Sequence, residues 1–342
     1  MNKSDSERIA TLLEKKGYKP ALNIKEADLI VVNMCSVRQS AVDRIYGLAN
    51  KFKKLKEEKP KLKTVLTGCI LNKDRAKFTK KFDQILRFKD LLKYQPKRQD
   101  KSIAFVPISN GCNNFCTYCV VPFTRGSLIC RNHQEILNEV KDLVKRGYKE
   151  IWLLGQNINH YRSKSKIKNP RRKTFGFLGG RQKSKVINFA KLLKMVNDIP
   201  GDFRIRFTSP HAADFTDELI NMIAKCKKVA HYLHLPVQSG DNEILKKMGR
   251  PYTVEQYKNL VRKIRKKIPD INLSTDIIVG FPGETRNQFE NTVKLMKEIE
   301  FNLAYISKYS PRSGTAAFCI KDNVPLKEKK RREKYLRSLL SS

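Results

Sequence analysis

The first hundred residues alternate between helical and strand-like patterns of apolar positions. Residues 4–17 have helical spacing, and the apolar runs 29–33 and 64–67 are typical of short buried strands, with a long helical pattern between them. Residues 94–102 are polar, contain Pro96 and are typical of a linker. We therefore expect a small α/β domain over residues 1–96.

From residue 103 onward, apolar strand patterns alternate with amphipathic helical patterns. A strand followed by a helix, repeated along the chain, predicts a parallel sheet that is either doubly wound or curled into a partial barrel. In such a barrel the chemistry lies at the carboxyl ends of the strands. The expected strands are 103–109, 150–155, 204–208, 230–236, 272–280 and 303–309, and the expected helices are 134–147, 188–198, 214–227, 253–268 and 286–300.

Residues 162–186 interrupt this alternation with a basic, glycine-containing insertion. Such a loop could contact phosphates. It could equally be a solvated loop without a role, and the sequence leaves both readings open.

The composition adds a strong positive charge to this picture. The chain carries 71 Lys and Arg against 33 Asp and Glu, a net charge of +38 over 342 residues. Such a field attracts polyanions, of which nucleic acid is the usual one. The alternative is a lysine-rich proteome, which would load every surface with positive charge.

The sequence shows neither a membrane-spanning segment nor a signal peptide. It contains no run of about 18 apolar residues, and its N-terminus lacks the apolar segment of a signal peptide. Its 8 Cys include a tight cluster of three, which is typical of metal ligands in a reducing compartment rather than of disulfides. We expect a cytoplasmic protein.

The cluster is a CxxxCxxC run formed by Cys112, Cys116 and Cys119, directly after the strand expected at 103–109. Three thiolates at this spacing can hold three irons of a [4Fe–4S] cluster and leave the fourth iron open for a small molecule. A zinc knuckle is the alternative, but zinc sites usually complete four ligands with a second pair. No such pair follows nearby, so the spacing favours an iron–sulfur cluster.

Two further cysteines, Cys35 and Cys69, end the strands expected in the N-terminal domain, where open α/β sheets place their sites. Without other information both would be interpreted as small buried apolar residues.

Ten segments along the chain form a further pattern. They are MNKSDSE (1–7), NMCSVR (33–38), TGC (67–69), GCNNFCTYCVVPFTRG (111–126), LLGQN (153–157), FTSPH (207–211), HLPVQSG (234–240), MGR (248–250), TDIIVGFPGE (275–284) and YSPRSGT (309–315). Taken together, and in this order, they resemble the radical S-adenosylmethionine (SAM) methylthiotransferases, and within them the branch acting on tRNA. The tail after Cys119 and the CSVR segment are most similar to enzymes that thiomethylate isopentenyladenosine beside the anticodon.

The resemblance implies a fold and the roles of individual residues. It implies a partial (β/α)6 radical-SAM barrel over residues 97–325, in which Cys112, Cys116 and Cys119 hold the SAM-cleaving cluster. It further implies that Cys35 and Cys69 are ligands of a second [4Fe–4S] cluster that supplies or relays sulfur, whereas Cys130, Cys226 and Cys319 match no ligand. By analogy, the SAM contacts are Gly155, Gln156, Ser209, Gln238 and Gly280.

The sequence departs from the family pattern at both ends. The first cysteine of the family would lie two residues before Met1, so we expect an N-terminal domain truncated at its start and a second cluster with two of its three thiolates. Residues 326–342 are expected to form the helix that leads to a C-terminal RNA-binding TRAM domain, which the sequence does not include.

The implied activity is conversion of N6-isopentenyladenosine next to the tRNA anticodon to its 2-methylthio derivative. The C–H bond at adenine carbon 2 is unactivated, so one-electron chemistry from cofactors is needed. The expected partners are a tRNA anticodon stem-loop and an electron donor of the flavodoxin or ferredoxin type, and we expect a monomer. Two alternatives stay open: the same chemistry on threonylcarbamoyladenosine in tRNA or on a ribosomal-protein aspartate, and a non-catalytic iron–sulfur or zinc RNA-binding protein.

Overall fold

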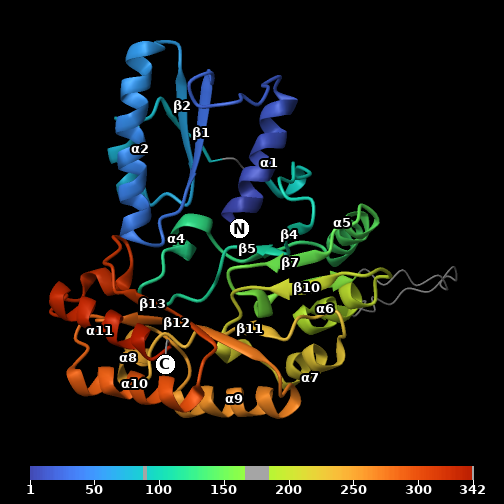
Figure 1. Cartoon of the computed structure of the whole chain (residues 1–342), viewed down its shortest axis with the longest axis vertical. Helices are drawn as coiled ribbons and strands as arrows, with labels where there is room; N and C mark the ends of the chain where they lie inside the picture. The colour runs from blue at the N-terminus through green and yellow to red at the C-terminus, as the bar shows by residue number, and fades with distance from the viewer. Residues whose placement is uncertain (88–90, 166–184, 341–342) are drawn as a thin grey trace, which may run out of the picture.

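The computed structural model describes residues 1–87, 91–165 and 185–340. Figure 1 shows two units, a smaller N-terminal one above and a larger barrel-like one below. The N-terminal unit is a three-stranded parallel sheet in the order β1-β2-β3, with helices packed around it. Its elements are α1 (Asn2–Lys15), β1 (Leu29–Met34), α2 (Gln39–Glu58), β2 (Lys63–Gly68), α3 (Asn72–Thr79) and β3 (Gln84–Ile85).

Helix α2 is positioned by one apolar stripe along its length. Val42, Ile45, Ala49 and Phe52 recur at intervals of three and four residues and are all buried. This spacing places them on one helical face, which packs into the core of the N-terminal unit. The start of α2 is thereby fixed a few residues after Cys35.

The larger unit contains six parallel strands that follow one another in chain order. Two three-stranded sheets are joined by a parallel bridge between Ile205 and Val229, which gives the order β4-β7-β10-β11-β12-β13. The expected partial barrel is confirmed. Its strands are β4 (Ile103–Pro107), β7 (Glu150–Leu154), β10 (Arg204–Phe207), β11 (Tyr232–His234), β12 (Asn272–Val279) and β13 (Leu303–Lys308), and its main helices are α5 (His133–Lys145), α6 (Phe189–Asn197), α7 (Asp217–Lys225), α9 (Val254–Lys267) and α10 (Arg286–Ile299).

The two faces of these strands have different surroundings. Successive side chains of a strand point to opposite faces. Ala104, Ile151, Ile205 and Leu233 point outward, are fully or almost fully buried and join the main hydrophobic core with the surrounding helices. The alternate side chains face the concave side of the barrel.

Several short elements complete the structure. The two shortest helices, α4 and α8, were not expected from the sequence, since five or six residues are too few to show a helical period. Helix α11 lies within the residues expected to form a helix near the C-terminus and packs on β13. These elements are β5 (Ser109–Asn110), α4 (Val121–Arg125), β6 (Ile129–Cys130), β8 (Arg162–Ser165), β9 (Lys185–Asn188), α8 (Asn242–Lys247), α11 (Leu326–Ser338) and the 3-10 turns η1 (Leu91–Lys93), η2 (Ile158–His160), η3 (Ala212–Asp214) and η4 (Ala316–Cys319).

Strands β8 and β9 pair antiparallel at the base of the basic insertion expected at residues 162–186. Residues 166–184 of that insertion lie outside the described residues. None of the helices within the described ranges is long and apolar enough to cross a membrane.

A buried ion network joins the two units. Glu139 of α5 accepts hydrogen bonds from Arg8 of α1 (3.2 Å), from Arg98 (2.6 Å) and from Arg131 (2.7 Å). The side chains of Arg8, Arg98 and Glu139 are less than a tenth exposed. Because an unpaired buried charge is costly, these contacts fix α1 against the barrel.

Candidate active site

The three clustered cysteines lie on a loop at the carboxyl end of the barrel sheet. Gly111 begins this loop with φ +83°, and a Cβ there would lie 2.2 Å from the carbonyl oxygen of Ser127. Only glycine fits this left-handed, crowded position. The N–H of Cys112 donates to the carbonyl of Gly126 (3.2 Å), so the loop folds back on itself.

The middle of the loop is fixed by α8. The N–H of Thr117 donates to the carbonyl of Met248 (3.0 Å), and its hydroxyl donates to the carbonyl of Lys247 (2.8 Å). Arg250, just after α8, donates to the hydroxyl of Tyr118 (2.7 Å). Residues more than a hundred positions apart in the sequence therefore shape the loop that carries the thiols.

The thiols themselves are shielded to different degrees. Cys112 is buried, whereas Cys116 and Cys119 are partly exposed. Burial raises the pKa of Cys112, and it raises the pKa of Cys119 to about 11. These groups are thus protonated at neutral pH, and metal binding has to release their protons.

No three His, Cys, Asp or Glu side chains converge on a single metal position anywhere in the described part of the chain.

A cavity of about 160 Å³ opens beside Cys119. Gln238, one of the predicted SAM contacts, lines it together with Asp276 and Tyr305. Gln238 has φ +75°, and its N–H donates to the carbonyl of Asp276 (2.9 Å). A glutamine held in this sparsely populated conformation is typical of a residue under functional constraint.

The predicted contacts Gly155, Gln156 and Ser209 lie around the base of the cysteine loop. The side-chain oxygen of Gln156 accepts from the N–H of Gly111 (2.6 Å), and a Cβ on Gly155 would lie 2.7 Å from the hydroxyl of Ser109. Ser209 has φ +60°, and its carbonyl accepts from Ile158. Gln156 therefore supports the loop that carries the thiols.

Gly280 lies in a different place. A Cβ on Gly280 would lie 2.4 Å from the side chain of Lys329, and its N–H donates to Glu284 (2.6 Å). Its missing side chain makes room for α11, and it is not among the residues that line the cavity beside Cys119. The structure gives Gly280 this packing role, and its contact with SAM stays a prediction.

The sequence analysis missed a set of buried polar atoms near the cysteine loop that have no hydrogen-bond partners in the structure. They are the hydroxyl of Ser109, the side-chain oxygen of Asn157, both ring nitrogens of His211 and Nε of Arg250. Burial, aided by the charge of Arg250, lowers the pKa of His211 to about 4, so its ring is neutral. Buried polar groups are normally paired, so these atoms fit a site for a polar ligand such as SAM. The segments LLGQN, FTSPH and MGR, which contain Asn157, His211 and Arg250, were the signal for these atoms in the sequence.

The second pair of cysteines meets at the ends of β1 and β2. The N–H of Cys69 donates to the carbonyl of Met34 (3.0 Å), next to Cys35. Gly68 has φ +99°, and a Cβ there would lie 2.4 Å from that same carbonyl. The close approach of the two strand ends therefore requires a glycine at position 68 and brings Cys35 and Cys69 together.

Arg125 is the main polar partner of Cys69. Its Nε donates to the sulfur (3.1 Å), and its other nitrogens donate to Asp5 (2.8 Å), Asn2 (2.8 Å) and Asn110 (3.0 Å). Cys69 and Arg125 line a cavity of about 560 Å³ between the two units. The Arg125–Cys69 contact joins residues 56 positions apart, and no periodicity predicts it.

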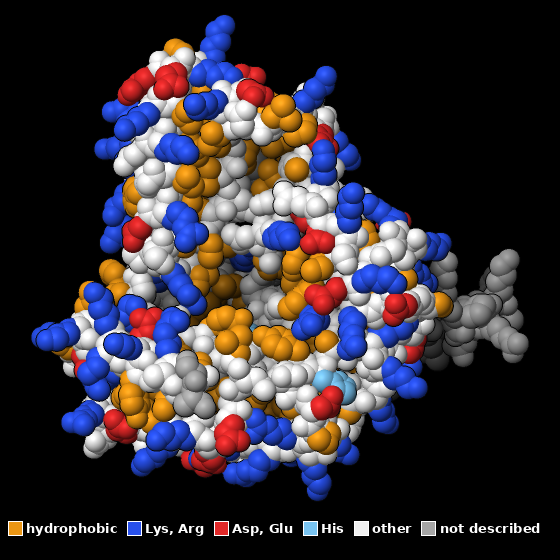
Figure 2. All heavy atoms as spheres, viewed as in Figure 1, with side chains coloured by type: hydrophobic (Ala, Val, Ile, Leu, Met, Phe, Trp, Pro, Cys, Tyr) orange, Lys and Arg blue, Asp and Glu red, His pale blue; other side chains and the backbone are white. Residues whose placement is uncertain are grey.

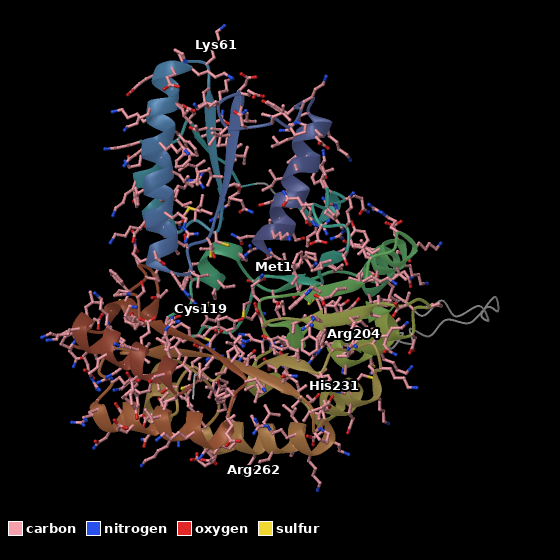
Figure 3. All side chains as sticks on the ribbon, viewed as in Figure 1. Met1, Lys61, Cys119, Arg204, His231 and Arg262 are labelled. Atoms are coloured by element: carbon pink, nitrogen blue, oxygen red, sulfur yellow. The ribbon has the colours of Figure 1, made fainter. Side chains whose placement is uncertain are left out.

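Helix α4 connects the two cysteine sites. It starts directly after Val120, beside Cys119, and ends at Arg125, which contacts Cys69. Figure 3 labels Met1 at the start of α1 and Cys119 on the barrel side, both toward the boundary of the two units. The five residues of α4 span only about 7.5 Å, so the two sites are neighbours.

The remaining three cysteines, which match no ligand of the family, lie in other parts of the structure. Cys226 is buried in the main core, Cys319 is exposed in η4, and Cys130 pairs with Ser109 between β5 and β6. In the described part of the chain, none of these three cysteines lines the cavities beside Cys69 and Cys119.

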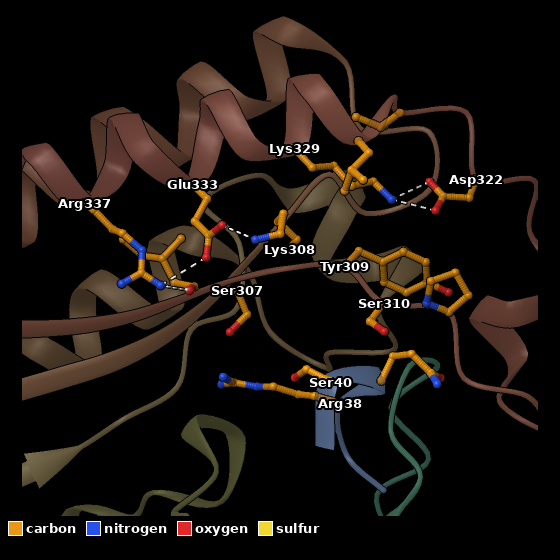
Figure 4. Close-up of a pocket in the computed structure, with 15 residues that line it drawn as sticks. Arg38, Ser40, Ser307, Lys308, Tyr309, Ser310, Asp322, Lys329, Glu333 and Arg337 are labelled. Carbon is orange, nitrogen blue, oxygen red and sulfur yellow. Dashed lines mark hydrogen bonds and ion pairs between the residues drawn. The ribbon is translucent and has the colours of Figure 1, made fainter. Parts of the chain in front are cut away.

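A larger, polar cavity of about 500 Å³ continues from the Cys119 cavity toward α11. Figure 4 shows Arg38 and Ser40 at its lower edge, opposite the ion pairs Lys308–Glu333 and Lys329–Asp322. Arg38 lines both cavities and is exposed. An exposed guanidinium therefore lies where the two cavities meet.

Comparisons with known proteins agree with this geometry. The Radical SAM superfamily model matches residues 106–296, and the model of Uncharacterized protein family UPF0004 matches residues 1–88. The tRNA-2-methylthio-N(6)-dimethylallyladenosine synthases of Clostridium botulinum and Thermoanaerobacter pseudethanolicus are each 41% identical, over 95% of this chain and 76% and 72% of their own lengths.

Among solved structures, the radical enzyme OxsB with aqua-cobalamin bound superposes with a TM-score of 0.52 at 15% identity. The match covers 97% of this chain and half of OxsB, and at this identity it shows the fold alone. The family model, the sequence relatives and the paired cysteine sites lead to one assignment: the chain belongs to the radical SAM superfamily and, within it, to the tRNA methylthiotransferases.

Proposed function

We propose that this protein converts N6-isopentenyladenosine in tRNA to its 2-methylthio derivative. The observation that carries the proposal is the short helix α4, which runs from beside Cys119 to Arg125 on Cys69. A methylthiotransferase needs hydrogen removal and sulfur delivery at one base, and this chain places two cysteine sites at opposite ends of five residues. The relatives at 41% identity carry the name of this activity.

In this proposal Cys112, Cys116 and Cys119 hold a [4Fe–4S] cluster that binds SAM. Together they supply the one-electron chemistry that an unactivated C–H bond requires. Gln238 lines the cavity in which the adenine is held, while Gly155, Gln156 and Ser209 shape the loop and its surroundings. The unpaired atoms of His211 and Arg250 give the polar groups of SAM buried partners.

Cys35 and Cys69 hold the second cluster, and Arg125 orients the Cys69 sulfur toward the cavity between the units. Arg125 is held in turn by Asp5 and Asn110, one from each unit. A buried guanidinium anchored at both ends keeps the sulfur site in register with the barrel.

RNA enters along the positive surface. The net charge of +38 provides a long-range attraction for phosphates, and Arg38 is available at the cavity entrance. The proposal includes a monomeric protein in the cytoplasm, reduced by a donor of the flavodoxin or ferredoxin type, and a domain division near residue 96. Threonylcarbamoyladenosine in tRNA and a ribosomal-protein aspartate stay as rival substrates.

The experiment is mass spectrometry of tRNA nucleosides from a bacterial strain that lacks its own isopentenyladenosine methylthiotransferase and expresses this chain. We expect 2-methylthio-isopentenyladenosine to appear with the unaltered chain and with Cys319→Ala, and to be absent with Cys116→Ala. A methylthio group found only on threonylcarbamoyladenosine would overturn the substrate assignment. Product formation with Cys116→Ala would overturn the mechanism.

A further inference from the structure

The concave side of the barrel carries a row of aromatic and cationic side chains from neighbouring strands. Phe105, Trp152 and Arg206 are direct cross-strand neighbours on β4, β7 and β10. The rings of Phe105 and Trp152 lie 6.4 Å apart, and the Arg206 guanidinium lies over both Trp152 (5.5 Å) and Tyr232 of β11 (5.6 Å). Lys3 covers the Phe105 end at 4.9 Å.

The row continues to the cavity beside Cys119. The hydroxyl of Ser274 on β12 donates to the Tyr232 hydroxyl (2.9 Å) and shares a hydrogen bond with Nδ1 of His234 (3.0 Å), both on β11. His234 packs edge-on against Tyr305 of β13 with ring centres 5.6 Å apart. Tyr305 itself lines the Cys119 cavity. We call Phe105, Trp152, Arg206, Tyr232, His234 and Tyr305 the aromatic ladder.

The aromatic ladder is only partly buried. All of its members are partly exposed, and Tyr305 is 48% exposed, whereas the outward-facing residues of the same strands are buried in the main core. Figure 2 shows hydrophobic side chains gathered over the barrel strands, below the hollow that separates the two units, with Lys and Arg around them. Rings that were only filling a core would be covered by other side chains.

The ring and guanidinium faces along the row favour a flat ligand. Glu150 accepts from Arg206 (3.0 Å) and from the indole N–H of Trp152, so its carboxylate is neutralised and holds the guanidinium flat against the ring. The ion pair offsets the charges of Glu150 and Arg206, Lys3 adds a cation at the Phe105 end, and Asp276 pairs with His234 (3.1 Å) at the other end. Aromatic faces alternating with guanidinium planes are typical of surfaces on which unpaired bases stack.

We infer that the aromatic ladder binds unstacked bases of the tRNA loop next to the adenosine that enters the Cys119 cavity. Five steps between six neighbouring strands span about 24 Å, which accommodates more than one base. This inference rests on the proposed function, because it takes the ligand to be a tRNA loop, and it adds the surface that holds the flanking nucleotides.

The chain contains a single Trp, so its fluorescence reports on the ladder alone. We expect an isopentenyladenosine-containing anticodon stem-loop, added to the cluster-containing protein under anaerobic conditions, to quench Trp152 emission saturably. A fully paired RNA hairpin of equal length should quench much less, because its bases are not free to stack. Equal quenching by both RNAs would overturn the inference.

Matched variants give a second measurement, the Kd of the labelled stem-loop from fluorescence anisotropy. Tyr305→Ala should weaken binding roughly tenfold, since one base–aromatic contact is worth about a factor of 5 to 150. Tyr18→Ala removes an equally exposed ring (47%) from the N-terminal unit and should leave Kd unchanged. Trp152→Phe, which keeps an aromatic face, should weaken binding less than Trp152→Leu.

The guanidinium has its own control. Arg206→Ala should weaken binding several-fold, whereas Arg146→Ala, which removes another guanidinium over a ring (Tyr148, 5.8 Å), should not. Iron content and circular dichroism identify variants that fail to fold. If the ladder variants and the control variants bind the stem-loop with equal Kd while nucleoside methylthiolation stays intact, the inference about the ladder is wrong and the proposed function stands. Absence of any stem-loop binding by the unaltered chain would overturn the proposed function as well.

Discussion

The contact of Arg125 with Asp5 gives the sharpest test of how the two cysteine sites are held together. Their side chains are 11% and 12% exposed and lie 2.8 Å apart. Arg125→Met would leave the Asp5 carboxylate buried without its cation and would also remove the donor to Cys69. Removing one partner of a buried pair costs about 3–5 kcal/mol of unfolding free energy, and we expect a loss at the lower end because the pair is not fully enclosed.

The double-mutant cycle separates this pair from its surroundings. Asp5→Asn keeps the shape but removes the charge, so Arg125→Met should cost about 2 kcal/mol less in the Asp5→Asn background than in the unaltered chain. The assay is guanidinium unfolding of the reduced protein, followed by circular dichroism. The control cycle uses the exposed helical pair Arg146 and Asp142 (3.4 Å), for which about 0.3–0.5 kcal/mol of coupling is expected.

Additivity within a few tenths of a kcal/mol at Asp5 and Arg125 would refute this reasoning, because two groups in one buried network cannot act independently. A coupling energy between Asp5 and Arg125 no larger than that between Arg146 and Asp142 would refute it as well. Either result would show that other contacts fix the Cys69 site against the barrel.

Three further predictions concern the chemistry, the RNA and the pH dependence. Cys112→Ala, Cys116→Ala and Cys119→Ala should each abolish 5′-deoxyadenosine formation, measured by chromatography, because the cluster loses one of its three thiolates. Stem-loop affinity should fall steeply between ~50 and ~200 mM salt, and Arg38→Ala should reduce the slope of log K against log salt by about 1. His211 has its pKa lowered to about 4, so the unfolded chain binds a proton below its own pKa of about 6.5 that the folded protein does not. Acidification from pH 7.5 to 5.5 should therefore cost about 1.4 kcal/mol of unfolding free energy through this residue, a loss that His211→Gln should abolish in denaturant titrations.

The barrel strands were predictable because their apolar runs are bounded by clear helical periods. Six expected strands correspond to β4, β7, β10, β11, β12 and β13, each within a few residues. The positions of Cys35 and Cys69 at strand ends were predictable for the same reason. The sequence could not show which loop residues contact distant elements, because periodicity carries no information about long-range contacts.

Gly280 and Gln156 illustrate the difference. Both occur in segments that resemble the family, and both were expected to contact SAM. Gly280 makes room for Lys329 of α11, and Gln156 holds Gly111 at the start of the cysteine loop. A motif identifies residues that matter, and the packing shows what each of them also supports in the protein. The SAM contacts of Gly280 and Gln156 stay predictions.

The arrangement of the two units follows from one property of parallel sheets. Parallel strands place their carboxyl ends along one edge, where the backbone is free to build a site. Cys35 and Cys69 follow β1 and β2, Cys112 follows β4 and β5, and Figure 1 shows the carboxyl ends of β1 and β2 directed toward the barrel. With the site-bearing edges of the two sheets brought together, a helix of only five residues is enough to connect them. The same arrangement leaves the concave side of the barrel open beside Cys119, and the aromatic ladder begins there.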